Sequence, residues 1–251
     1  MPYPFLRAAP VLRAALLGGL LLAATGPAGA AGDDAGPSFG PDCSDLQGDY
    51  KVTEGKIAYD FVTPRSGDPK VDAALAAFVT ALRDEAVTEG SANPPPPDSA
   101  VQEYTYMLSC WVARNGPEIA SYIFVDYQYT GGAHGISAFH TKSYAKDDNR
   151  EIALADLFAD MDKALPRLSA GAVAALTAKL GEAADADWIA KGAGPQAENF
   201  RNFAIGEDAL ILLFDQYQVG AGSIGLQEVR LPFQSLDGLW SDTAKALLAG
   251  N

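Results

Sequence analysis

Two apolar stretches in the middle of the chain predict a β-hairpin. They cover residues 101–114 and 119–129, and Asn115-Gly116-Pro117 separates them as a turn. Along the second stretch both faces carry bulky side chains: Ile119, Ile123, Val125, Tyr127 and Tyr129 on one face, and Tyr122, Phe124, Asp126 and Gln128 on the other. Bulk on both faces is typical of a strand inside a sheet, so we expect this strand to be central, with a helix over one face.

The clearest helix prediction lies upstream of the hairpin. Asp68 suits the N-cap and Pro69 the first helical position. Apolar residues then recur at helical spacing and form one stripe: Val71, Leu75, Phe78 and Leu82. We expect this helix to end at Gly90, before a proline-rich connector, and to follow an extended segment at residues 50–61 with a turn at Gly55.

The C-terminal half adds further strands and helices. The pattern predicts a strand over residues 136–146, a short apolar segment over 151–158, and a helix capped by Ser169 that ends near Leu180. After one or two helical turns within 183–200, we expect strands over 203–205, 209–217 and 226–231, and a last helix over 236–248. Because hairpins prevail over repeated strand–helix–strand units, the expected class is α+β, with a mixed, mainly antiparallel sheet and helices packed on it.

The first 30 residues have the pattern of a secretory signal peptide. Arg7 and Arg13 precede an apolar run at residues 14–24, and Ala28 and Ala30 form a cleavage site. A retained membrane anchor is the alternative, but the run is shorter than the roughly 20 residues that cross a bilayer. We therefore expect cleavage after Ala30, a periplasmic or secreted protein, a flexible lead-in at residues 31–42, and no membrane span in the mature chain.

The charge of the chain limits its partners. The formal net charge is −14, and loss of Arg7 and Arg13 with the leader makes it about −16. This balance argues against nucleic-acid binding and against binding to anionic lipid, since both need clustered Lys and Arg. It favours a cationic partner. A hydrophobic share of 48% excludes wholesale disorder.

The two cysteines, Cys43 and Cys110, are most simply read as one disulfide in an exported chain. Closing a loop of about 67 residues would stabilise the fold by about 4 kcal/mol in the chain-entropy model. The alternative is two separate buried thiols. Two cysteines alone cannot form a structural zinc site.

A glycine-rich segment follows the central strand: Thr130-Gly131-Gly132-Ala133-His134-Gly135. Its glycines suit backbone angles that other residues resist. His134 has two readings, either an acid–base or hydrogen-bonding group at a binding loop, or an imidazole that holds the turn by bonding backbone carbonyls. A phosphate-binding loop is rejected, because a strand follows rather than a helix.

Other chemical sites have weaker support. His134 and His140 could share a metal with Asp126 or Asp215, but their spacing suits neither a helix nor alternate strand positions. No G-x-S-x-G nucleophile motif is present. Aromatic residues could line a groove for sugar or protein, although such residues on central strands are more often core: Tyr122, Phe124, Tyr127, Tyr129, Phe214 and Tyr217. We therefore predict no catalytic residues, no metal and no cofactor.

The segment from Tyr127 to Gly135 resembles the most recognisable motif of a bacterial extracytoplasmic family of largely unknown function. That family includes the sensor domain of RsiV-type anti-sigma factors and the non-catalytic domain of PdaC-type peptidoglycan deacetylases. Residues 151–158, 210–219 and 228–233 fit the same order, and residues 57–110 resemble a preceding companion domain.

The resemblance implies a non-catalytic binding module with a strand–helix–strand companion part at residues 43–114 and an RsiV/PdaC-like domain at 115–251. The implied ligand is a protein such as lysozyme, or a peptidoglycan component. The candidate binding residues are Gly131, Gly132, His134, Gly135, Tyr129 and Tyr217. Two alternatives remain, an envelope hydrolase that uses His134 and a purely structural envelope protein.

Overall fold

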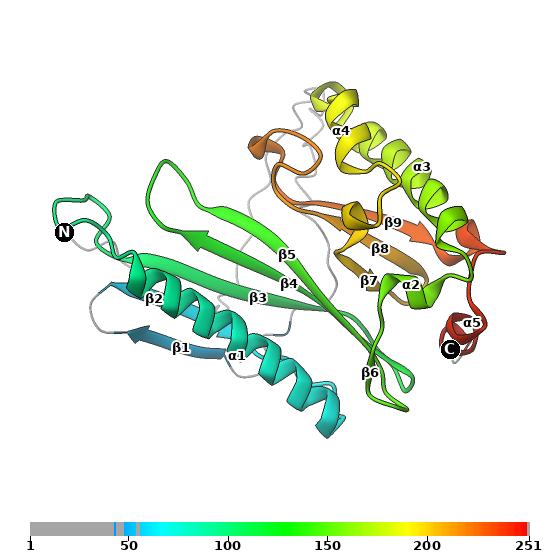
Figure 1. The fold of residues 1–251 in the computed structure, drawn as a ribbon, viewed down its shortest axis with the longest axis horizontal. Helices are drawn as coiled ribbons and strands as arrows, with labels where there is room; N and C mark the ends of the chain where they lie inside the picture. The colour runs from blue at the N-terminus through cyan, green and yellow to red at the C-terminus, as the bar shows by residue number, and fades with distance from the viewer. Residues whose placement is uncertain (1–42, 44–47, 54–55, 250–251) are drawn as a thin grey trace, which may run out of the picture. The chain divides into compact units, whose positions relative to one another are not determined.

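The computed structural model describes Cys43 and residues 48–53 and 56–249 (Figure 1). The predicted signal peptide, the lead-in at residues 31–42 and the turn at Gly55 lie outside the described residues. None of the described helices combines the length and apolar character that crossing a bilayer requires.

The larger sheet has six strands in the order β1-β2-β3-β4-β5-β6. Their bounds are β1 Gly48–Thr53, β2 Ile57–Val62, β3 Tyr104–Asn115, β4 Ile119–Tyr129, β5 Ile136–Ala145 and β6 Arg150–Glu151. All neighbours are antiparallel except β2 and β3, which are parallel. A parallel pair needs a crossover connection, and helix α1 (Pro69–Ala92) supplies it (Figure 1).

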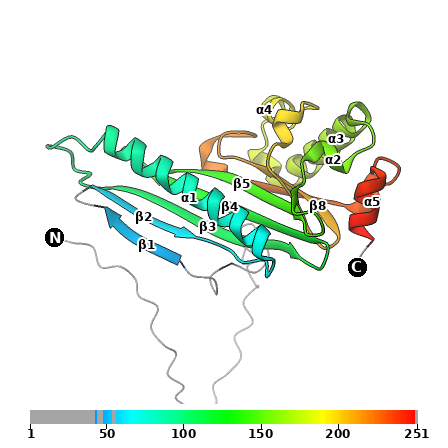
Figure 2. The same ribbon diagram turned by 60° about the horizontal axis from the view of Figure 1, so that its bottom comes forward.

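The predicted start of α1 is confirmed. The Asp68 carboxylate accepts the backbone N–H groups of Lys70 and Val71 at 2.8 and 3.2 Å, and Pro69 begins the helix. The helix continues to Ala92, two residues past the expected end at Gly90. Figure 2 shows α1 lying along one face of the larger sheet.

The predicted central position of β4 is also confirmed, since it lies between β3 and β5. Tyr122 and Phe124 face α1 and belong to the core that includes Leu75. The opposite face, represented by Ile123, packs against Ile211 and other residues of a second sheet.

This second sheet has three antiparallel strands, β7 (Phe203–Ile205), β8 (Ala209–Phe214) and β9 (Gln227–Pro232), as the pattern predicted to within a few residues. Its other face packs on the remaining helices in a single core. The helices are α2 Leu154–Leu157, α3 Met161–Leu180, α4 Ala186–Gly192 and α5 Asp242–Leu248, with short 3-10 turns at Gly181–Ala183, Ala197–Phe200, Gly222–Ile224 and Phe233–Leu236. The predicted α+β class with a mixed, mainly antiparallel sheet is confirmed.

Two helix predictions were wrong. Helix α3 starts at Met161 with Asp160 as its N-cap. Ser169, the predicted N-cap, therefore lies buried in the middle of the helix. The predicted last helix over 236–248 consists of a 3-10 turn and the separate helix α5. Between them Trp240 forms an isolated β-bridge with Phe158, which interrupts the helical path. Helix α5 then begins after Ser241, whose hydroxyl caps it by accepting the N–H of Ala244 at 3.0 Å.

Buried hydroxyl groups join the two sheets. Strand β7 lies at the edge of its sheet, and the N–H of Ile205 donates to Ser121 Oγ on β4 at 2.9 Å. Ser121 Oγ lies 2.8 Å from Ser143 Oγ on β5. The N–H of Phe203 donates to Thr141 Oγ1 at 3.3 Å. Polar residues inside β4 and β5 therefore satisfy backbone donors of the second sheet.

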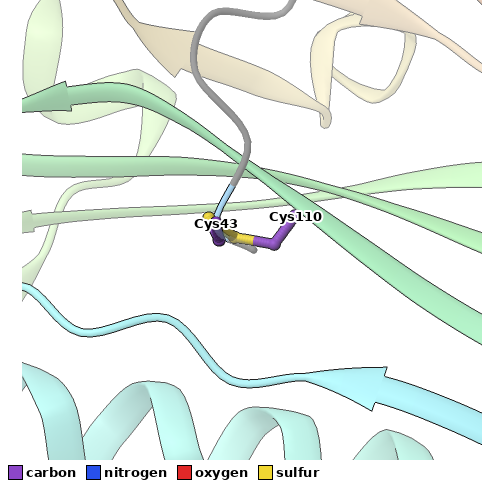
Figure 3. Close-up of a disulfide and its surroundings, with 2 residues drawn as sticks. All are labelled: Cys43 and Cys110. Carbon is purple, nitrogen blue, oxygen red and sulfur yellow. A yellow bond between two sulfur atoms is a disulfide. The ribbon is translucent and has the colours of Figure 1, made fainter. Parts of the chain in front are cut away.

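The predicted disulfide between Cys43 and Cys110 is present, with a Cα–Cα distance of 5.2 Å (Figure 3). Both residues are buried, and the N–H of Cys43 donates to the carbonyl of Cys110 at 2.9 Å. The bridge therefore attaches the chain ahead of β1 to the middle of β3.

Candidate functional site

The loop between β4 and β5 takes its shape from its glycines. Gly131 and Gly132 have φ angles of +95° and +107°, which disfavour residues with a Cβ. Gly135 lies against the ring of Tyr127, which occupies the space that a Cβ would need. The Tyr129 hydroxyl donates to the carbonyl of Gly132 at 3.1 Å and closes the loop.

His134 is exposed on this loop. Its Nδ1 lies 2.9 Å from the carbonyl oxygen of Gly135, the backbone contact expected if the imidazole holds the turn. Because only Nδ1 makes this contact, Nε2 stays available for a second role. Both readings of His134 therefore remain compatible with its position.

A first hollow of about 250 Å³, the loop hollow, lies beside this loop on the α1 side of the sheet. Its residues are Asp126, Gln128 and Thr130 at the end of β4, Gly131 and His134 in the loop, and Ile136 and Ala138 on β5. Asp126 is opposite Ala138, and Gln128 is opposite Ile136. Alternation along each strand therefore brings these side chains to one face.

A second hollow of about 130 Å³, the helix hollow, lies between the sheet and the C-terminal part of α1. Its apolar residues are Phe61, Leu82 and Ala86, and its polar residues are Glu85, Glu89, Asp126, Gln128 and His140. Asp126 and Gln128 line both hollows, so the two are adjacent. Together they form an acidic depression that contains both histidines of the protein.

Asp126 is the best-enclosed charge of this depression, with 12% of its side chain exposed. Its Oδ2 accepts a hydrogen bond from Gln128 Nε2 at 2.8 Å and lies 3.7 Å from His140 Nε2. The His140 ring also packs against Phe78 on α1 in a T-shaped arrangement, with ring centres 5.9 Å apart. These contacts hold His140 between helix and strand.

The structure separates the predicted site residues into two places. Gly131 and His134 line the loop hollow, and Gly132, Gly135 and Tyr129 build the loop itself. Tyr217 lies elsewhere, after β8, where its ring fills the space beside Gly222 and its carbonyl accepts Trp188 Nε1–H at 2.9 Å. That any of these residues bind a ligand stays a prediction.

The sequence analysis missed the acidic wall of the helix hollow, which Glu85 and Glu89 of α1 form. Glu85 and Glu89 are four residues apart and off the apolar stripe of α1, which gives them a shared helix face. The sequence alone did not indicate that this face looks toward Asp126.

The alternative metal site finds no support in the described part of the chain, where no group of three or more His, Cys, Asp or Glu side chains could hold a metal. Asp215 instead accepts the N–H of Phe139 at 2.7 Å and an amide N–H of Asn202 at 3.2 Å, and it pairs with Arg201. Asp215, directly after β8, thus connects the second sheet to β5 through the N–H of Phe139.

Comparison with known proteins finds a family match for the C-terminal part of the chain. Residues 155–234, from α2 to the end of β9, match the family described as "Protein of unknown function (DUF3298)". This part of the chain is therefore similar to a DUF3298 domain. The loop hollow and the helix hollow lie outside the matched residues, so this match says nothing of them.

A curated protein is also similar to part of the chain. The chain is 35% identical over 120 residues to the peptidoglycan-N-acetylmuramic acid deacetylase PdaC of Bacillus subtilis (strain 168). The match covers 48% of this chain and 26% of PdaC, so the chain spans about a quarter of the length of that relative. The predicted resemblance to the PdaC-type family is confirmed, whereas the activity of the whole relative does not follow from it.

Two crystal structures share the fold. A DUF3298 family protein from Pseudomonas aeruginosa PAO1 aligns with a TM-score of 0.56 at 19% identity, covering 79% of this chain and 96% of the other. A DUF3298 family member from Bacteroides fragilis NCTC 9343 aligns with a TM-score of 0.54 at 14% identity, covering 83% and 100%. These likenesses extend the shared fold well beyond residues 155–234. The predicted domain division at residues 114 and 115 stays a prediction.

Proposed function

We propose that this protein is a periplasmic or secreted, non-catalytic binding module whose ligand is a cationic protein such as lysozyme. A cell-wall component is the other ligand class that the resemblance implies. The location rests on the leader-like N-terminus, on the disulfide, and on the relative named as a peptidoglycan deacetylase.

The observation that carries the proposal is the acidic depression beside the glycine loop. It contains three carboxylates, from Glu85, Glu89 and Asp126, and none of its lining residues is Lys or Arg. In a chain of net charge −14, such a surface raises the association rate of a cationic protein and favours it over an anionic one.

The test uses the leaderless protein on a sensor surface, with lysozyme as analyte at low and moderate salt. Wild-type protein should retain lysozyme, and moderate salt should weaken the retention. Asp126→Asn should weaken binding about tenfold or more. The matched control Glu182→Gln removes one charge from an exposed 3-10 turn outside both hollows. No retention at either salt concentration removes lysozyme as a ligand, and equal affinities for both variants remove this site.

The alternative function is an envelope hydrolase, and the position of His134 favours it over other catalytic readings. The imidazole shares the loop hollow with Asp126, which is an arrangement that acid–base chemistry can use. We expect no turnover of ester, amide or glycan substrates, including N-acetylmuramic acid oligomers. Turnover that disappears in His134→Ala would replace the binding proposal with the enzymatic one.

A further inference from the structure

A third hollow, the edge hollow, has a volume of about 290 Å³ and lies where β5 loses its neighbour β6. Its lining residues include Thr141, Glu151, Leu154, Met161, Phe200 and Arg201. The pairing of β6 with β5 ends at Ile152, whose N–H donates to the carbonyl of Ser143 at 2.7 Å. Continued pairing would place Leu154 opposite Thr141, but Leu154 begins α2, which follows β6 closely (Figure 1). One position on the edge of β5 is therefore left open at Thr141.

The backbone of Thr141 points out of the larger sheet. The N–H of Phe139 donates to Asp215 Oδ1 at 2.7 Å, so it points away from β4. The N–H of Ser137 does the same, and donates to Gln216 Oε1 at 3.1 Å. Alternate residues of an antiparallel strand turn both N–H and C=O to the same side, and the register of β4 with β5 is unbroken. Thr141 therefore directs both groups to the open edge, where neither has a hydrogen-bond partner within the described part of the chain.

These two groups fit one residue of an extended peptide. In an antiparallel ladder, the N–H and C=O of one residue bond to the C=O and N–H of the residue opposite. A ligand that satisfies both groups of Thr141 therefore needs a donor and an acceptor that flank one carbon atom, as the two amides of a peptide residue do. A single amide cannot reach both groups, because its own N–H and C=O point in opposite directions.

The side chain of such a residue would enter the edge hollow. Residues directly opposite each other in a sheet have their side chains on the same face. The side chain of Thr141 faces the second sheet, where its Oγ1 accepts the N–H of Phe203 at 3.3 Å. Leu154, Met161 and Phe200 line the hollow and belong to, or pack on, the core beneath that sheet. They offer apolar contact to an incoming side chain.

The charged residues of the edge hollow are already paired, which favours an uncharged ligand residue. Glu151 Oε1 lies 2.7 Å from Lys142 Nζ. Arg201 pairs with Asp215 and lies 3.7 Å from Glu198 Oε1. A charged ligand side chain would lose its hydration against apolar walls without gaining a free counter-charge. An aliphatic side chain instead gains from burial.

We propose that the edge hollow binds one aliphatic residue of an extended peptide segment of a partner protein. The backbone of Thr141 pairs with the two amides of that residue, and its side chain packs against Met161 and Phe200. Binding is thus strand addition at a gap of one residue. The edge hollow shares no residue with the loop hollow or the helix hollow, so this inference goes beyond the proposed function and does not depend on lysozyme binding.

The first test is an NMR titration of the leaderless protein with the peptide acetyl-Ala-Leu-Ala-amide. We expect the amide resonance of Thr141 to shift downfield, with further shifts at Phe200 and Phe203. N-methylation of the leucine removes the donor to the Thr141 carbonyl, and glycine in its place removes the apolar side chain. Each change should weaken binding by about tenfold. No shift at Thr141 with the parent peptide, or an unchanged affinity for either analogue, would overturn the proposal.

A second test blocks the hollow. Ala197 lines the edge hollow from the exposed start of the 3-10 turn Ala197–Phe200, and Ala197→Phe should fill the hollow and abolish peptide binding. The matched control Ala183→Phe adds the same ring to the exposed turn Gly181–Ala183, outside the hollow, and should bind as wild type does. Circular dichroism checks that both variants fold, and both should retain lysozyme equally. Equal peptide affinities of the two variants would refute the edge hollow as the site.

Discussion

Replacement of Ser121 by alanine should loosen the connection between the two sheets. Ser121 is fully buried, and its Oγ accepts the N–H of Ile205 on the edge strand β7. Alanine leaves this donor without a partner in a site shielded from water. An unsatisfied buried donor costs about 1–3 kcal/mol, and the hydroxyl of Ser143 loses its neighbour as well. We therefore expect a loss of about 2 kcal/mol in the free energy of unfolding.

The measurement is urea unfolding of the oxidised, leaderless protein, followed by far-UV circular dichroism and tryptophan fluorescence. Coincident transitions would justify a two-state analysis. A loss of about 2 kcal/mol corresponds to a decrease of roughly 4–8 °C in Tm for a domain of this size.

Ser143→Ala is the matched control, because it removes the hydroxyl contact but leaves Ser121 Oγ to accept from Ile205. It should cost about 1 kcal/mol, the value of one ordinary hydrogen bond. If Ser121→Ala unfolds at the wild-type urea concentration, or if Ser143→Ala costs as much, the hydroxyl group does not join the sheets in the way described.

Three further predictions concern the loop, the disulfide and the first helix. Gly135→Ala should lower stability by about 1–3 kcal/mol, measured by thermal unfolding, because the ring of Tyr127 must move; an unchanged Tm would contradict the close packing. Replacing Cys43 and Cys110 by serine should cost about 4 kcal/mol, since 67 residues separate them, and a urea midpoint equal to that of the oxidised protein would argue against the chain-entropy account. Hydrogen bonds from the backbone N–H groups of Val71 and Lys70 lower the pKa of Asp68 below 3.8. The contribution of the Asp68 cap to the stability of the fold is therefore complete above that pH and is lost as the pH falls through the lowered pKa. The Tm difference between wild type and Asp68→Ala should therefore shrink under acid conditions, and a constant difference would speak against the cap.

The predictions that held depend on local signals. Strand β4 begins and ends where the pattern placed it, because Gly116-Pro117 and the glycine loop mark its two ends. The cap of α1 was readable from Asp68 and Pro69 alone. The disulfide followed from the number of cysteines and the expected compartment.

The predictions that failed depend on tertiary contacts. The buried positions Ala164, Leu168, Ala172 and Leu176 of α3 recur every four residues, but Pro166 stands among them, and the pattern read from Ser169 onward missed the first half. Nothing local showed that residues 237–241 would leave the helical path to bridge Phe158. The acidic wall was missed because Glu85 and Asp126 meet only through the packing of α1 on the sheet.

The parallel pairing of β2 and β3 gives the protein an order of assembly. Strands β3, β4 and β5 are joined by short connections and can pair early, whereas β2 reaches β3 only across the connection that contains α1. The helix hollow has its floor on β4 and its wall on α1, so it closes with this slow, long-range step. The three-stranded meander of β3, β4 and β5 is therefore expected to form first, and the hollow only after α1 has packed on it.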